Sequence, residues 1–98
     1  MFVLIARYLR PAEEVDRHLD GHREWIVRNF AEGRFLLTAR QVPLTGGLIL
    51  ARAADEAELR AEIALDPFVV NGLAEYDILE FSPVRAAPGL ESLLPEAG

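Results

Sequence analysis

The first strand-like segment of the chain constrains the fold most strongly. Residues 2–8 read Phe-Val-Leu-Ile-Ala-Arg-Tyr and are β-prone and apolar on both alternating faces. Successive side chains of a strand point to opposite faces, so this pattern indicates a strand that is buried on two sides. The chain has 98 residues, which is enough for one domain with a single modest core. We therefore expect a small protein built on a sheet whose two faces both need cover.

Start and stop signals predict two helices. Pro11 suits the first turn of a helix that should run to about Glu32, with Gly33 as its stop signal. Asp55 resembles the cap of a second helix. This helix should end near Asp66, because the proline that follows disfavours helical geometry in the residue before it.

Apolar, β-prone stretches predict strands at residues 2–8, 35–41, 48–53 and 76–84. Together with the helices they give the order β-α-β-β-α-β, which is the ferredoxin-like arrangement. The predicted fold class is therefore α+β, with a four-stranded antiparallel sheet. Right-handed crossovers place both helices on one face of that sheet. We expect the folded domain to span residues 1–85.

The opposite face of the sheet has no cover within the predicted domain, although the first and third strands are apolar on both sides. An apolar patch of this kind on a soluble protein usually marks an interface. We therefore expect a homodimer that forms through this sheet face. The alternative is that the C-terminal tail, residues 86–98, folds back over part of the sheet. Its prolines and glycines otherwise indicate a loose extension.

Composition excludes several classes of chemistry. The chain has no Cys, and its basic residues are all Arg, so it offers neither a thiol nucleophile nor a lysine for a Schiff base. A formal net charge of −6 argues against binding to nucleic acid and against docking on an anionic membrane. The N-terminal apolar run is too short for a signal peptide or a membrane span, which predicts a cytoplasmic protein.

Two polar residues are predicted to point into the core. On the first helix, His22 falls in the middle of an apolar stripe, and His18 lies at its margin alongside Trp25. The stripe consists of Val15, Leu19, Ile26 and Phe30. On the second helix, Asp66 lies in line with the inward-facing residues. A hydrogen-bonded pair of imidazole and carboxylate offsets much of the cost of burying either alone.

Spacing alone leaves two interpretations of this pair. It either holds the two helices in register or forms a His–Asp dyad at a pocket, in which the carboxylate orients the imidazole for acid–base chemistry. His18 and His22 are also four residues apart, as metal-binding histidines on a helix are. However, Leu19 stands where zinc proteases carry a glutamate, and His18 turns away from the stripe. We therefore predict no metal site.

Three segments together resemble the YciI-like (YCII-related) proteins over nearly the whole domain. Residues 22–39 resemble that family's histidine-bearing helix, which closes with Glu-Gly before a strand. Residues 43–50 resemble its turn into the third strand, and residues 66–81 its closing segment. The resemblance implies a dimeric α+β barrel. It also implies an active site built around a histidine and an aspartate, which fall here on His22 and Asp66.

One departure from the family pattern lies just after Thr38, in the second predicted strand. Many relatives have glycine at a position where this chain has Arg40. A guanidinium there narrows the pocket, contacts an anion, or is a solvated charge at the end of a strand. Thr38 either lends its hydroxyl to the pocket or is an ordinary β-former. We take Thr38, Arg40 and Phe68 as the predicted substrate-binding residues.

Two functions compete for such a protein. The first is a cofactor-free enzyme that uses His22, oriented by Asp66, as acid and base in the elimination or isomerisation of a small organic molecule. Other dimeric α+β barrels carry out such chemistry, which is an analogy of fold alone. The alternative is a non-catalytic ligand-binding or accessory homodimer, and a third reading is a purely structural dimer. The enzyme requires an opening to solvent beside His22.

Overall fold

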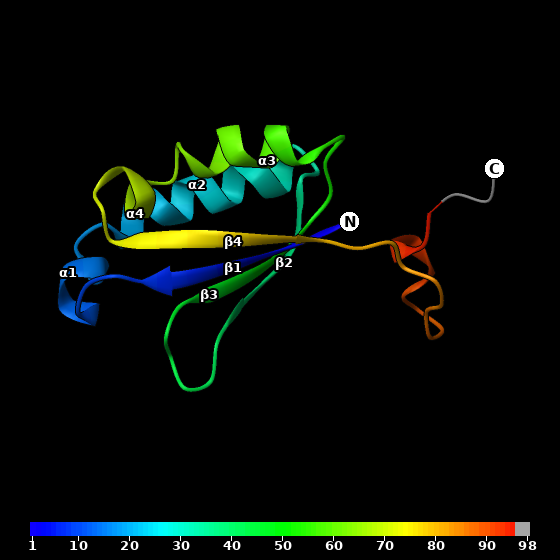
Figure 1. Ribbon diagram of the computed structural model, residues 1–98, viewed down its shortest axis with the longest axis horizontal. Coiled ribbons are helices and arrows are strands. Elements are labelled where there is room, and N and C mark those ends of the chain that lie inside the picture. The colour runs from blue at the N-terminus through cyan, green and yellow to red at the C-terminus, as the bar shows by residue number, and fades with distance from the viewer. Residues whose placement is uncertain (96–98) are drawn as a thin grey trace.

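The computed structural model describes residues 1–95 as one antiparallel sheet with helices packed against it (Figure 1). The strands lie in the order β2-β3-β1-β4. Their bounds are Phe2–Tyr8 for β1, Phe35–Arg40 for β2, Gly47–Ala51 for β3 and Ala74–Glu80 for β4. This strand order confirms the predicted ferredoxin-like α+β fold.

The first predicted helix is broken, so the prediction of one helix over residues 11–32 is wrong. α1 spans Ala12–Asp16 and α2 spans Leu19–Ala31, and His18 leaves helical geometry between them. Val15 on α1 packs into a small apolar cluster separate from the main core. α2 lies along the sheet (Figure 1). The helix breaks because a single straight helix could not pack along the sheet in this way and also place Val15 in the separate cluster.

The break changes which residues of α2 face the sheet. Trp25 and Asn29 are buried, with 4% and 0% exposure, whereas Phe30 is 41% exposed. The predicted stripe from Val15 to Phe30 assumed a continuous helix, and it therefore placed Phe30 in the core incorrectly. His22 still faces inward, because it lies one helical turn before Trp25.

The second predicted helix is shorter than expected. α3 spans Glu56–Ile63, and Asp55 caps it by accepting a hydrogen bond from the Glu58 backbone N–H at 2.9 Å. The chain then turns, and Asp66 caps a separate short helix, α4, which spans Pro67–Val70. Asp66 therefore begins a new helix instead of ending α3, and its side chain is free to act as a cap.

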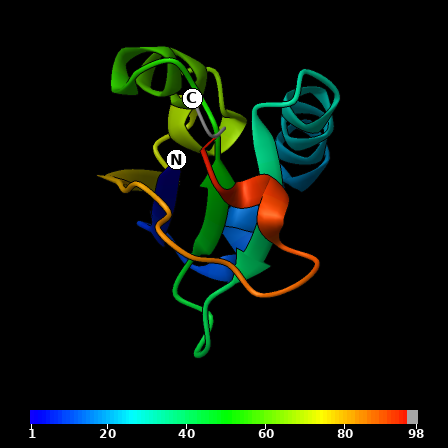
Figure 2. The same ribbon diagram turned by 90° about the vertical axis from the view of Figure 1, so that its right-hand side faces the viewer.

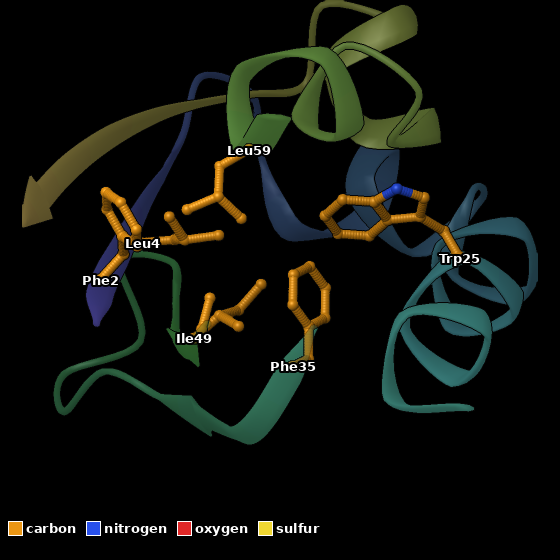
Figure 3. Close-up of a cluster of buried hydrophobic side chains, with 7 residues drawn as sticks. Phe2, Leu4, Trp25, Phe35, Ile49 and Leu59 are labelled. Carbon is orange, nitrogen blue, oxygen red and sulfur yellow. The ribbon is translucent and has the colours of Figure 1, made fainter. Parts of the chain in front are cut away.

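One apolar cluster fills the space between the sheet and the helices (Figure 3). Trp25 reaches from α2 to Phe35 on β2, where the two ring centroids lie 5.1 Å apart. The buried members of the cluster are Phe2, Leu4, Trp25, Phe35, Ile49, Ala51 and Leu59. Because they come from three strands and two helices, this core sets how α2 and α3 sit on the sheet.

An irregularity in β2 decides which of its side chains face the helices. The pairing with β3 shifts by one residue between Phe35 and Leu37, so that Leu36 is an extra residue, as in a β-bulge. Strict alternation would put Phe35 and Thr38 on opposite faces. Because of the shift, Thr38 and Arg40 share the helix-facing side with Phe35.

The opposite face of the sheet carries no helix in the described range, residues 1–95 (Figure 1). Its apolar side chains are half-buried or exposed, and they are Val3, Ile5, Leu37, Leu48, Leu50 and Leu79. On the same face, Arg7 forms ion pairs with Glu75 and Asp77. We call these six apolar side chains the open face.

The chain beyond β4 runs to one end of the sheet. β4 ends at Glu80, earlier than the predicted end at Val84, and residues Glu91–Leu93 form a 3-10 turn (Figure 2). Arg52 donates to the Ser92 carbonyl at 2.9 Å and so ties this segment to the end of β3. Of the predicted tail, residues 86–98, the last three lie outside the described residues.

The core assignment predicts a large loss of stability in Leu59→Ala. Leu59 is 0% exposed, so the variant should lower the free energy of unfolding by about 2–5 kcal/mol. Leu65→Ala makes the same change at a side chain that is 58% exposed, and it should cost less than about 0.5 kcal/mol. Urea denaturation measures both values, and equal losses in the two variants would contradict the assignment.

Candidate active site

A buried carboxylate collects three donors from three parts of the fold. Asp66 is 0% exposed. Its Oδ1 accepts from His22 Nδ1 at 2.8 Å and from the Phe68 backbone N–H at 3.0 Å. Its Oδ2 accepts from the Tyr76 hydroxyl at 2.7 Å. A buried charge is tolerated when it is paired and hydrogen-bonded, and these three bonds meet that condition. The expected contact between His22 and Asp66 is therefore present.

The His22 ring is held in one orientation. Phe68 stacks on it, with ring centroids 3.9 Å apart and planes 4° from parallel. Because a carboxylate only accepts hydrogen bonds, Nδ1 of neutral His22 carries the hydrogen and Nε2 keeps a free lone pair. Within residues 1–95, Nε2 has no hydrogen-bond partner. In the same range, every buried side-chain nitrogen has a partner, so Nε2 is not a buried atom. It follows that Nε2 is open to solvent.

His22 faces a cavity of about 480 Å³ between α2 and the helix-facing side of the sheet. The three predicted binding residues, Thr38, Arg40 and Phe68, line this cavity together with His22. Asp66 is not part of the wall and contacts the cavity only through its neighbours. The arrangement can accept a proton at Nε2 from a molecule in the cavity, while Asp66 stabilises the imidazolium that results.

Three polar residues of the cavity wall were not predicted from the sequence: Tyr8, Arg23 and Tyr76. Tyr76 sits between Ala74 and Ile78 on the inward face of β4, and this alternation is a signal that could have found it. Arg23 carried no such signal, because a charged residue beside an apolar stripe is normally solvated.

The two phenols of the wall are neutral at physiological pH. Burial raises the pKa of Tyr76, and the negative charge of Asp66 and the hydrogen bond to it raise that pKa further. Burial also raises the pKa of Tyr8, although the positive charge of Arg40 acts in the opposite direction. Tyr76 is therefore a permanent donor to Asp66 in the folded protein.

A second polar cluster ties α2 to α3. Asn29 donates to the Trp25 carbonyl at 2.9 Å and accepts from Arg34 at 2.6 Å. The Trp25 indole N–H donates to the Glu62 carbonyl at 3.0 Å. These bonds hold Trp25 in place 5.7 Å from the His22 ring, measured between centroids. No sequence pattern indicated this cluster, because Asn is usually exposed on a helix.

His18, the other histidine, lies at the N-terminal boundary of α2 and does not line the cavity. Within residues 1–95, no three side chains of His, Cys, Asp or Glu are grouped as in a metal site. In the same range, no helix has the length and apolar character needed to cross a membrane.

The fold and the cavity define a small α+β protein with a hydrogen-bonded His–Asp pair at a pocket. Residues 1–82 match the YCII-related domain, and the chain belongs to this family. No curated protein matches the chain.

The fold is also similar to that of a solved enzyme, the 5-chloro-2-hydroxyhydroquinone dehydrochlorinase TftG from Burkholderia phenoliruptrix AC1100, in complex with 2,5-dihydroxybenzoquinone. The TM-score is 0.69 at 18% sequence identity, over 84% of this chain and 94% of that one. At this identity the likeness establishes the fold alone.

The hydrogen bonds to Asp66 predict a specific effect of Tyr76→Phe. The variant leaves a buried acceptor short of one partner, so the free energy of unfolding at neutral pH should fall by about 1–3 kcal/mol. Tyr8→Phe is the matched control, because Tyr8 is not a donor to Asp66, and it should cost less than about 0.5 kcal/mol. Urea denaturation of the two variants measures the difference.

The same variant should change the response to alkali. Folding raises the pKa of Tyr76 above its unfolded value near 10, so its contribution to stability is complete below about pH 10 and is lost as the pH rises further. Tyr76→Phe should therefore lose less stability than the wild type above about pH 10. Parallel losses in the two proteins, measured by urea denaturation across this range, would contradict the assignment.

Proposed function

We propose that this protein is a cofactor-free acid–base enzyme acting on a small organic molecule bound in the cavity. The observation that carries the proposal is the state of His22. Its Nδ1 is held by buried Asp66 at 2.8 Å, its Nε2 has no protein partner within residues 1–95, and the residue lines the cavity. In a pair with a purely structural role, we would expect both ring nitrogens of the histidine to form hydrogen bonds within the protein, or the unbonded nitrogen to be buried away from any cavity.

The proposed reaction is an elimination or an isomerisation. Nε2 of His22 takes a proton from the bound molecule, and Asp66 stabilises the resulting imidazolium. In an elimination, the electron pair left behind forms a new double bond and an anion departs. In an isomerisation, His22 returns the proton to another atom of the same molecule. Thr38 and Phe68 contact the bound molecule in this proposal, because both line the cavity.

The similar enzyme supports the elimination. TftG is a dehydrochlorinase, and its name describes the removal of hydrogen chloride, which pairs a proton with a departing anion. A dyad with an open Nε2 suits the first half of that step. We therefore take 5-chloro-2-hydroxyhydroquinone as the first molecule to test with this chain.

The competing function is a ligand-binding module that uses the same cavity without turnover. It predicts binding of a small molecule beside His22 and no chemical change in that molecule. Binding and turnover therefore have to be measured on the same compound in order to separate the two functions.

We also propose that the protein is a homodimer that associates through the open face. This face gathers six apolar side chains from all four strands, and within residues 1–95 no helix lies over it. A second copy would remove this surface from water. From residues 81–95, Leu90 and Leu93 line a shared hollow with Leu50 of the open face.

The acid–base proposal predicts that His22→Gln loses turnover. Chloride release from 5-chloro-2-hydroxyhydroquinone measures an elimination directly. The variant should lower kcat by about 10²–10⁴-fold, which is the usual contribution of one general acid–base group. His18→Gln is the matched control, because His18 belongs to the same segment and does not line the cavity, and its kcat should equal that of the wild type.

Turnover that survives in His22→Gln would contradict the dyad mechanism. Binding of 2,5-dihydroxybenzoquinone by the wild type, measured by calorimetry, without turnover of chlorinated hydroquinones would favour the ligand-binding module.

The dimer proposal predicts that Leu79→Glu yields a monomer. Leu79 lies on the open face and is 58% exposed in the single chain, so a carboxylate there would be buried without a partner in the dimer. Leu65→Glu introduces the same charge at a leucine of equal exposure on the helix side, and it should leave the dimer intact. Light scattering after size exclusion measures the mass, and a monomeric wild type would contradict the proposal.

A further inference from the structure

The charges that line the cavity are of one sign, in contrast to the rest of the chain. The sequence has 16 acidic residues against 10 basic ones. The cavity wall nevertheless contains Arg23 and Arg40 beside His22, and no Asp or Glu. The charged side chains that line this cavity are thus positive although the protein as a whole is acidic, which favours the binding of an anion there.

Arg23 and Arg40 are also free of partners. Among residues 1–95, neither guanidinium forms an ion pair with a carboxylate within 4.0 Å. Neither donates a side-chain hydrogen bond in the same range, unlike five other arginines. Other arginines of this chain are engaged: Arg28 and Arg34 both pair with Glu62. The planar fork of donors that suits a carboxylate is therefore available at both cavity residues.

The two arginines approach the cavity from different walls. Arg23 comes from α2, directly after His22. Arg40 comes from the end of β2, and it faces the cavity because of the register shift at Leu36. The stacked rings of His22 and Phe68 line the same cavity as the two arginines. A planar ring can therefore lie against the aromatic groups while its charged substituent meets the arginines.

We propose that Arg23 and Arg40 select a substrate that binds as an anion, namely a small planar ring bearing a carboxylate or an ionised acidic hydroxyl. This inference rests on the proposed function for the location of the site and deepens it by assigning the class of substrate. Arg40 provides the principal anion contact, and Arg23 adds to it. The two guanidinium groups also stabilise the negative charge that develops on the ring during proton removal.

The test compares two probes that differ in charge and share their shape. Benzoate and benzamide are both planar rings, and only benzoate is an anion. Titration calorimetry at low ionic strength measures the Kd of each for the wild type and for three variants, Arg23→Gln, Arg40→Gln and Arg85→Gln. Arg85 lies beyond β4 and does not line this cavity, so its variant matches the change in net charge.

Wild type should bind benzoate at least about tenfold more tightly than benzamide, as expected for a charge-assisted pair. Arg40→Gln should remove most of this preference, Arg23→Gln should reduce it, and Arg85→Gln should leave it within about twofold. Added salt should weaken benzoate binding and leave benzamide unaffected. Equal affinities in the wild type, a preference that survives in Arg40→Gln, or no saturable benzoate binding at millimolar concentration would each overturn the proposal.

These outcomes are separate from those of the catalytic proposal. The binding measurement requires no turnover, so a charge preference together with full turnover in His22→Gln would reject the dyad mechanism alone. Loss of turnover in His22→Gln together with no charge preference would reject the anion site alone.

Discussion

The buried carboxylate of Asp66 is the interaction on which the arrangement of the cavity depends. It is fully enclosed, and the three donors that compensate its burial come from α2, from the first turn of α4 and from β4. An unpaired charge at this depth would cost several kcal/mol. The folded state therefore requires α2, α4 and β4 to lie close enough together for all three donors to reach Asp66. One side chain thereby fixes the position of the helix that carries His22 relative to the sheet.

The irregular parts of the helices follow from the same requirement. Asp66 accepts the Phe68 N–H only because α3 stops at Ile63 and a new helix begins after the turn. That new helix brings the Phe68 ring flat against His22. The break near His18 in turn allows α2 to lie along the sheet, with Trp25 in the core. The His22 ring is thus held by a hydrogen bond to Asp66 and by stacking on Phe68.

The sheet separates two roles. Its helix-facing side supports the core and the cavity, and the register shift in β2 adds Thr38 and Arg40 to that side. Its other side presents the open face, where apolar residues gather near a charged group around Arg7. In our proposals one side binds an anionic ring and the other binds a second copy of the chain. Both depend on a sheet whose central strand is apolar in both directions.

The sequence by itself determined the strand order and the cap at Asp55, and it pointed to His22 and Asp66 as inward polar residues. These features follow from local patterns: alternation, helical spacing and capping chemistry. Only the tertiary structure decided where α1 ends, that α4 exists, and that Thr38 and Arg40 share the helix-facing side of β2 with Phe35. It also added Arg23 to the wall. Such features arise from packing between distant segments, which overrides local preference and leaves no periodic trace in a single sequence.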